Sequence, residues 1–180
     1  GAVAARTKKV KIGLAVHVLP LRNPVQIAEE IATLDHLSDG RLDFGIGRSA
    51  FPRIYQGYGF DYSESRDRFD ECLEIILKSW TEERFSFKGK YYQYDDLCVV
   101  PKPLQKPHPP IWLPGVVSRD SLMWAAEKRI PYIMLATEMD PPKLAYQLYH
   151  DTAAEHGYES GPQNLGYLWK VHVDETEELA

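Results

Sequence analysis

Residues 41–51 read RLDFGIGRSAF, and the choice between two fold classes depends on this stretch. Gly45, Gly47 and Ala50 satisfy the G-x-G-x-x-G/A spacing of a dinucleotide-binding turn. That spacing has a physical meaning only where a strand enters the glycines and a helix leaves directly from them. The reason is that a bound pyrophosphate needs the exposed N–H groups of that helix.

The residues around the glycines predict the strand but not the helix. RLDFGIG (41–47) predicts a strand, the second of the chain. The following segment passes Pro52, Gly57 and Gly59 before any helical period begins, near Ser63 or Ser65. We therefore expect that the glycines do not open a helix, and a nicotinamide dehydrogenase ranks last among the functions considered.

Composition limits the class of protein. The chain has 180 residues, of which 44% are hydrophobic, and its formal net charge is −5. Its basic residues are scattered, which disfavours nucleic acid and anionic membranes as partners, and no apolar run is long enough to span a membrane. Because no signal peptide is recognisable at the N-terminus, we expect a cytoplasmic protein. Cys72 and Cys98 lack metal or disulfide spacing and are expected to be buried thiols.

Apolar runs and helical periods alternate along the chain. Strands are predicted at 10–19 (buried on both faces), 41–47, 111–115, 131–136 and 166–173, and helices at 24–39, from 63 or 65 to about 80, at 118–129 and from 141 to about 157. Residues 85–100 predict an inserted hairpin, and 101–110 an extended connection with a possible cis bond in His108-Pro109-Pro110. This order predicts parallel pairing, in a doubly wound sheet or a (β/α) barrel.

Caps and apolar positions support the individual helices. Asn23 is expected to cap the first predicted helix, with Pro24 at its first position; Ser118 and Asp140 are expected to cap the last two. The buried faces are expected to hold Ala28, Ile31, Ala32, Leu34 and Leu37 in one helix, and Phe69, Cys72, Leu73, Ile76 and Trp80 in the next. Five strands cannot close a barrel, so we expect an interior piece of a longer chain.

Four stretches together resemble one family, the bacterial luciferase-like, flavin-dependent monooxygenases and their relatives that use a deazaflavin coenzyme. They are VLPLRNPVQIAEEIATLDHLSDGRLDFGIGRS, SRDRFDECLEIILKSWTEE, FSFKGKYYQYDDL and PKPLQKPHPPIWLPG, in the family's order. The resemblance implies an α/β fold, the (β/α)8 TIM barrel. Residues 1–180 would form part of that barrel domain, without its first two strand-helix units and its end, and with the hairpin near 85–100 as an insertion. The family's active-site histidine belongs to a missing unit, so no catalytic residue is named.

The resemblance also implies a set of cofactor-binding residues. Arg48 of FGIGRS resembles the family's flavin-phosphate ligand, with Gly47 and Ser49 beside it; its planar cation suits phosphate, whereas the alternative is a surface ion pair. Ser118 and Ser121 match the second phosphate contact, although Ser118 is equally well explained as a helix cap. The strand GLAVHVLP resembles the family strand with a non-prolyl cis peptide beneath the flavin, which corresponds to Ala15-Val16.

The remaining candidate residues have structural explanations of equal or greater weight. Strand alternation directs His17 away from the side of Val16, which favours a structural or pocket-edge histidine. His36 is expected to favour the end of its helix, and the spacing of His108, His150, His156 and His172 does not predict a metal site. A last group lies after Arg48 and is expected either to line a substrate pocket or to pack a loop: Arg53, Tyr55, Tyr58 and Phe60.

The function implied by the resemblance is oxygenation of a small organic substrate by reduced FMN and O2, with FMN supplied by a separate flavin reductase. Two alternatives remain: a deazaflavin-dependent hydride transfer, and a non-catalytic partner subunit. The full-length protein is expected to be a homodimer.

Overall fold

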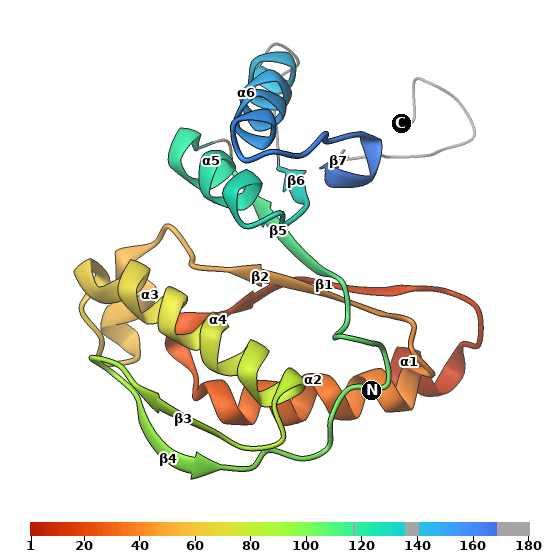
Figure 1. Cartoon of the computed structure of the whole chain (residues 1–180), viewed down its shortest axis with the longest axis vertical. Coiled ribbons are helices and arrows are strands. Elements are labelled where there is room, and N and C mark those ends of the chain that lie inside the picture. The colour runs from red at the N-terminus through yellow and green to blue at the C-terminus, as the bar shows by residue number, and fades with distance from the viewer. Residues whose placement is uncertain (117, 136–140, 169–180) are drawn as a thin grey trace, which may run out of the picture. The chain divides into compact units, whose positions relative to one another are not determined.

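A computed structural model describes residues 1–116, 118–135 and 141–168, without the side chains of 141 and 142. The chain forms two compact units, Gly1–Ile111 and Trp112–Ala180. Both have the α/β character that the sequence predicts, with parallel strands connected through helices (Figure 1).

The first unit contains one parallel strand pair, covered by two long helices. Strand β1 (Ile12–Val18) pairs with β2 (Leu42–Gly47), and α2 (Pro24–Ser38) and α4 (Ser65–Thr81) lie together on one face of that pair (Figure 1). The shorter elements of this unit are α1 (Ala2–Arg6), η1 (Leu19–Leu21), α3 (Pro52–Gly57), η2 (Tyr62–Glu64), β3 (Phe85–Lys88) and β4 (Gln93–Leu97).

The second unit holds the remaining strands and helices. Strand β5 (Ile111–Gly115) starts at the boundary between the units and pairs in parallel with β6 (Tyr132–Met134), which pairs in parallel with β7 (Leu165–Tyr167). The helices are α5 (Arg119–Glu127), α6 (Pro141–Glu155) and the single turn η3 (Pro162–Asn164). Asp140, residues 169–173 of the last predicted strand and His172 lie outside the described residues.

The first long helix forms as its cap residues predict. The side-chain oxygen of Asn23 accepts hydrogen bonds from the backbone N–H groups of Val25 and Gln26, at 2.9 and 3.3 Å. At the other end Asp39 is left-handed, with φ of 57°, and Gly40 follows with φ of 69°.

The apolar face of α2 differs from its prediction at two positions. Ala28, Ile31 and Ala32 are buried, but Leu34 is half-buried and Leu37 is 61% exposed. The buried face includes Asp35 instead, because its carboxylate accepts hydrogen bonds from the backbone and the side-chain amide of Gln105, at 2.8 and 2.7 Å. The helix thus fastens the 101–110 connection through a polar contact that an apolar pattern cannot reveal.

The core of the first unit lies between the strands and the two long helices. The predicted inner face of α4 is confirmed, since Phe69, Cys72, Leu73, Ile76 and Trp80 are all buried. The Trp80 indole meets the Phe44 ring edge-on at 5.6 Å and donates a 3.0 Å hydrogen bond to the Ala28 carbonyl. One tryptophan therefore joins β2, α2 and α4.

Strand β1 is not buried on both faces, which corrects its prediction. Gly13, Ala15 and Val16 are exposed, and the strand begins at Ile12. The reason is positional, because β1 lies at the edge of the strand order and β2 is its hydrogen-bonded neighbour in the described part of the chain. Burial of a strand depends on its neighbours, which its own residues do not specify.

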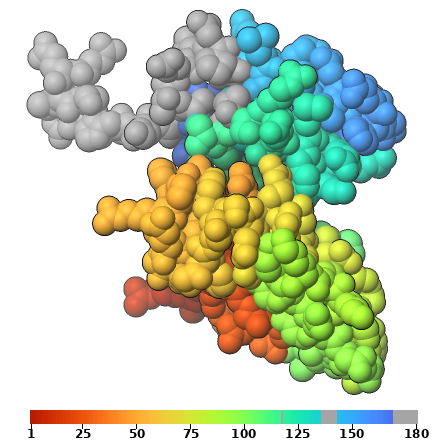
Figure 2. Space-filling model, turned by 90° about the vertical axis from the view of Figure 1, so that its left-hand side faces the viewer, coloured from red at the N-terminus to blue at the C-terminus, as the bar shows by residue number. Residues whose placement is uncertain are grey.

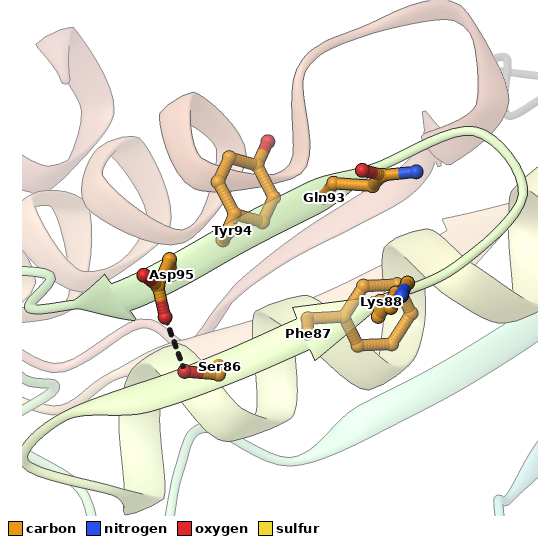
Figure 3. A pocket seen from close by; sticks show the side chains of 6 residues that line it. All are labelled: Ser86, Phe87, Lys88, Gln93, Tyr94 and Asp95. Carbon is orange, nitrogen blue, oxygen red and sulfur yellow. Dashed lines mark hydrogen bonds between the residues drawn. The ribbon is translucent and has the colours of Figure 1, made fainter.

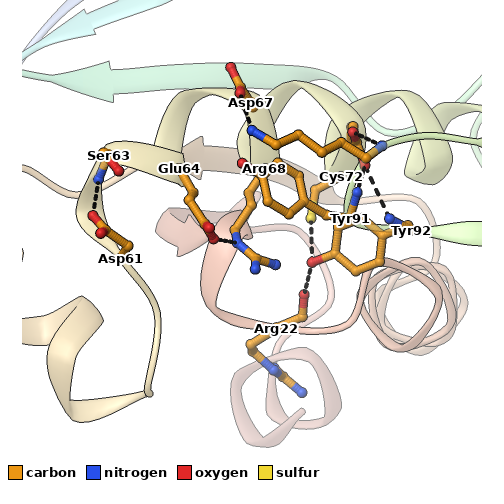
Figure 4. Close-up of polar contacts among 11 residues, drawn as sticks. Arg22, Asp61, Ser63, Glu64, Asp67, Arg68, Cys72, Tyr91 and Tyr92 are labelled. Atoms are coloured by element: carbon orange, nitrogen blue, oxygen red, sulfur yellow. Dashed lines mark hydrogen bonds and ion pairs between the residues drawn. The ribbon is translucent and has the colours of Figure 1, made fainter.

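The predicted hairpin is confirmed, and α4 fixes its tip. Strands β3 and β4 pair antiparallel. The Glu71 carboxylate accepts backbone N–H groups from Lys90, Tyr91 and Tyr92, at 2.7, 3.0 and 3.2 Å. The Arg68 guanidinium lies 4.1 Å from the centre of the Tyr91 ring and donates to Glu64 at 2.8 Å (Figure 4).

Two smaller predictions are wrong. The cis proline bonds are Val100–Pro101 and Lys106–Pro107, and not a bond within residues 108–110. Cys98 is exposed, although Cys72 is buried as predicted. Among the described residues, no helix combines the length and apolar character needed to cross a membrane.

Strand β2 comes so close to β1 that two of its positions have no room for a side chain. A Cβ atom at Gly45 would lie 1.7 Å from the Leu14 carbonyl oxygen, and one at Gly47 would lie 2.6 Å from a Val16 methyl carbon. These glycines of the quoted motif therefore serve a contact between two strands. A pyrophosphate turn is not needed to explain them.

We expect Gly45→Ala to lower the free energy of unfolding by at least about 3 kcal/mol, because the Leu14 carbonyl belongs to the backbone and cannot move aside. Gly13→Ala in β1 is the matched control, since nothing lies within 4 Å of its Cβ position. That variant should retain its stability or gain about 0.5 kcal/mol. Urea unfolding of the full-length protein measures both, and equal effects of the two substitutions would contradict the close approach.

The two cysteines should differ in reactivity. Burial raises the pKa of the Cys72 thiol to about 11, so at about pH 8 a smaller fraction is thiolate than in an ordinary cysteine. Iodoacetamide should alkylate Cys98 in the native protein and spare Cys72, and should modify both after unfolding; mass spectrometry of the peptides distinguishes them. Equal labelling of both thiols in the native protein would show that Cys72 is not buried.

Candidate functional site

Strand β1 bulges where a flavin contact is expected. Leu14 pairs with Phe44 and His17 with Ile46, so three steps along β1 match two along β2. The peptide bond between Ala15 and Val16 is cis, which confirms the predicted position of the non-prolyl cis bond. The contacts of Val16 and His17 place these two neighbours on different sides of the strand pair, since Val16 lies against Gly47 and the His17 ring packs against Phe44.

Val16 presents an apolar surface on the Gly47 side of the strand pair. Its side chain lies against the bare backbone of Gly47 and is 38% exposed. An exposed branched side chain at the carboxyl end of a strand suits contact with a flat apolar ring.

His17 lies on the other side, as predicted. Its ring packs 6.1 Å from the Phe44 ring, and its Nε2 is buried without a hydrogen-bond partner among the described residues. Burial, with the positive charge of Arg22, lowers the pKa of the imidazole, so His17 is neutral near pH 7. Its surroundings are those of a core histidine.

Arg48 follows β2 directly and is half-buried. One of its terminal nitrogens, Nη1, donates a 2.8 Å hydrogen bond to the Ser65 hydroxyl. Among the described residues it makes no ion pair with a carboxylate, and its Nε and Nη2 donate to no protein atom. The alternative of a surface ion pair therefore finds no support, and a cation with unused donors remains.

Arg41, at the start of the same stretch, has a purely structural set of contacts and serves as a comparison for Arg48. Its guanidinium donates to the carbonyl oxygens of Ser38, Val10, Thr7 and Ala4, at 2.6 to 3.1 Å, and to the Thr7 hydroxyl at 2.9 Å. Every donor of Arg41 is used inside the protein. The contrast identifies Arg48 as the arginine of this stretch that is available to an anion.

Ser49 turns the chain after Arg48. It adopts φ of 67°, in the left-handed region, and its hydroxyl accepts a 3.3 Å hydrogen bond from the Phe51 N–H. A short helix follows from Pro52, which corrects the expectation that no helix precedes Ser63. Because α3 starts five residues after Gly47, with Phe51 at its N-cap, the glycines do not open it, as predicted.

Of the four candidate residues around α3, two pack within the loop and two are exposed. Tyr55 is fully buried and its hydroxyl donates to the Arg48 carbonyl oxygen, while the Arg68 guanidinium lies 4.5 Å from the centre of the Phe60 ring. Tyr58 is 62% exposed and Arg53 is exposed, in a region that lies at the surface of the first unit (Figure 2, orange). Tyr55 and Phe60 therefore pack the loop, as one of the two interpretations proposed.

In the second unit, Ser118 and Ser121 lie at the start of α5. Ser118 occupies the N-cap position, with extended backbone, but its side chain makes no capping hydrogen bond. It is exposed and Ser121 is half-buried. The Ser118 hydroxyl therefore accepts no hydrogen bond from the first N–H groups of α5. The phosphate role of both serines stays a prediction.

A hollow of about 410 Å³ lies over the hairpin, lined by Ser86, Phe87, Lys88, Gln93, Tyr94 and Asp95 (Figure 3). The Ser86 hydroxyl donates to the Asp95 carboxylate at 3.3 Å. The hollow contains none of the residues expected to bind a cofactor, and only β3 and β4 line it. It is a surface feature of the hairpin.

Three further histidines contact other residues of the protein. His36 contacts the Lys102 carbonyl oxygen at 2.8 Å, His156 contacts that of Thr152 at 2.9 Å, and His108 packs against Trp80. In residues 1–116, 118–135 and 141–168, no group of three or more His, Cys, Asp or Glu side chains could hold a metal ion.

Among the curated relatives with functional names are two monooxygenases from different bacteria. The chain is 30% identical over 154 residues to the alkanal monooxygenase alpha chain of the Kryptophanaron alfredi symbiont, covering 85% of this chain and 43% of that protein. It is 35% identical over 120 residues to the oxygenase component of the flavin-dependent trigonelline monooxygenase of Acinetobacter baylyi, covering 66% and 32%. The chain thus spans less than half the length of these relatives.

Solved structures share the fold. The monooxygenase RslO1 of Streptomyces bottropensis is 27% identical with a TM-score of 0.89, over 99% of this chain and 55% of that one. The oxygenating constituent of 3,6-diketocamphane monooxygenase from Pseudomonas putida, in complex with FMN, is 25% identical with a TM-score of 0.83, over 92% and 49%. A third structure is the F420-dependent tetrahydromethanopterin reductase of Methanopyrus kandleri. It is 20% identical with a TM-score of 0.75, over 92% of this chain and 51% of that one, which shows a shared fold and no more.

These neighbours are TIM-barrel enzymes, so the described strands and helices correspond to part of such a barrel, as predicted. The sequence model of the family described as "Luciferase-like monooxygenase" matches residues 1–180. The chain therefore belongs to the luciferase-like monooxygenase family.

Proposed function

We propose that the protein containing this chain is a flavin-dependent monooxygenase that uses reduced FMN and O2 to oxygenate a small organic substrate. The observation that carries the proposal is Arg48, a half-buried cation at the carboxyl end of β2 with unused donors. Phosphate is the anion that a planar guanidinium with adjacent N–H donors binds well. Two relatives named as monooxygenases, one of them flavin-dependent by name, support the choice of chemistry.

Different residues of this chain would bind the phosphate and the ring of the flavin. Arg48 would hold the flavin phosphate, next to Gly47 and Ser49, and the exposed Val16 side chain beside the Ala15 peptide would support the ring. Ser118 and Ser121 would offer hydroxyls and free N–H groups to the phosphate at the start of α5. Bound FMN would supply the oxygen chemistry, while the protein orients it and excludes water.

A partner protein can be proposed from one of the two relatives named as monooxygenases. One is named as an oxygenase component, which supports a separate flavin reductase as partner. We also propose that residues 1–180 are part of one barrel domain with the β3–β4 hairpin inserted, and that the full-length protein is a homodimer, as the family resemblance implies. A deazaflavin-dependent hydride transfer is the second candidate, favoured by the fold shared with an F420-dependent reductase.

Arg48→Ala should weaken binding of reduced FMN by about 1.5–3 kcal/mol, the scale of a hydrogen bond to a charged group. Binding of riboflavin, which lacks the phosphate, should stay unchanged. Anaerobic fluorescence titration of the full-length protein measures both ligands. Arg53→Ala, which removes an exposed arginine of α3, is the matched control and should leave both affinities unchanged. Equal losses of FMN and riboflavin binding in Arg48→Ala would assign Arg48 a purely structural role.

Reduced FMN should bind to the full-length protein more tightly than the reduced deazaflavin coenzyme, because two relatives are named as monooxygenases and one of them as flavin-dependent. NADH should bind more weakly than either, because no helix starts directly at the glycines of β2. The same anaerobic titration compares the three ligands. Tighter binding of the deazaflavin would establish the hydride-transfer alternative. Binding of NADH alone would overturn the flavin assignment.

A further inference from the structure

Three side chains gather around Arg48, and we call the four residues together the Arg48 cluster: Arg48, Tyr55, Tyr62 and Ser65. They come from the end of β2, from α3, from η2 and from the first residue of α4. All four lie in the first unit. The cluster holds the arginine at both its main chain and its side chain.

The main chain of Arg48 is fixed by Tyr55. The buried Tyr55 hydroxyl donates to the Arg48 carbonyl oxygen. Burial raises the pKa of this hydroxyl to about 12, so it keeps its proton, and its ability to donate, throughout the physiological range. The Tyr55 ring also meets the Tyr62 ring edge-on at 5.2 Å.

The side chain of Arg48 is fixed by Tyr62 and Ser65. The guanidinium carbon lies 5.6 Å from the centre of the Tyr62 ring, and Nη1 donates to the Ser65 hydroxyl at 2.8 Å. The Ser65 side chain is 1% exposed. It does not cap α4, because the N-cap residue is Glu64 and the helix has no side-chain cap.

A fixed orientation matters for an arginine that binds phosphate. A free arginine side chain loses substantial rotamer entropy when a ligand orders it, and this loss weakens binding. Ser65 accepts the hydrogen of one terminal nitrogen and leaves Nε and Nη2 with no protein acceptor among the described residues. Those two nitrogens are adjacent on one edge of the guanidinium, which is the geometry of a two-point contact with phosphate oxygens.

We propose that Ser65 is a positioning residue for phosphate binding. Its buried hydroxyl holds the Arg48 guanidinium so that the Nε–Nη2 edge is preorganised for the flavin phosphate. Ser65 acts through Arg48 and does not itself touch the ligand. The proposal rests on the proposed function, because it takes the phosphate of a flavin as the anion that Arg48 binds.

The test is a double-mutant cycle with two ligands, reduced FMN and riboflavin, on the full-length protein. Ser65→Ala should weaken FMN binding about threefold to tenfold and leave riboflavin binding unchanged. In the Arg48→Ala background, Ser65→Ala should have no further effect on FMN. Ser79→Ala is the matched control, since Ser79 is a buried serine of the same helix whose hydroxyl donates to the Ile75 carbonyl at 2.7 Å. It should not change the ratio of FMN to riboflavin affinity.

The outcomes separate this proposal from the proposed function. If Arg48→Ala selectively weakens FMN binding but Ser65→Ala does not, the positioning role is wrong and the phosphate role of Arg48 stands. If Arg48→Ala does not distinguish FMN from riboflavin, the phosphate role itself fails. An additive effect of Ser65→Ala in the Arg48→Ala background, or an equal loss of both ligands in Ser65→Ala, would also overturn the positioning role.

Discussion

The close approach of β1 and β2 is the constraint on which the candidate site depends. The Leu14 carbonyl oxygen occupies the space that a side chain at position 45 would need, and a Val16 methyl group occupies that at position 47. Two glycines in β2 make this approach possible, and Val16 contacts Gly47 on one side while His17 packs against Phe44 on the other. The apolar surface of Val16 and the end of β2, where Arg48 emerges, are consequences of the same contact between backbones.

The two arginines that flank β2 show how similar residues acquire different functions. Arg41 is enclosed by backbone carbonyl groups and holds α1 and the start of β1 to the rest of the first unit. Arg48 is held by one hydroxyl and one aromatic ring and retains unused donors. Because a half-buried cation with unused donors favours an anionic partner, the free edge of Arg48 indicates a ligand site among the described residues of the first unit. The preorganisation by Ser65 and Tyr62 would then convert that edge into affinity.

Local signals predicted much of the fold, and contacts between distant residues account for the rest. Asn23 and Pro24 stand next to the helix that they start, so the first long helix could be predicted from adjacent residues. The glycine spacing of β2 suggested a dinucleotide turn, but the glycines serve the contact with β1, which no local pattern reveals. The cis bond at Ala15 was found by family resemblance. The half-exposed β1 and the short α3 were missed, since both depend on neighbours. Arg48 was found by resemblance, whereas Ser65, 17 residues away, carries no motif and only the fold brings it to the guanidinium.

A crystal structure of the full-length protein with FMN tests the central claim most directly. It should show the FMN phosphate within hydrogen-bond distance of Arg48 Nε and Nη2, with the hydrogen bond from Nη1 to Ser65 retained and the Val16 side chain against the flavin ring. A phosphate bound elsewhere, with the Arg48 guanidinium donating only to protein atoms, would contradict it.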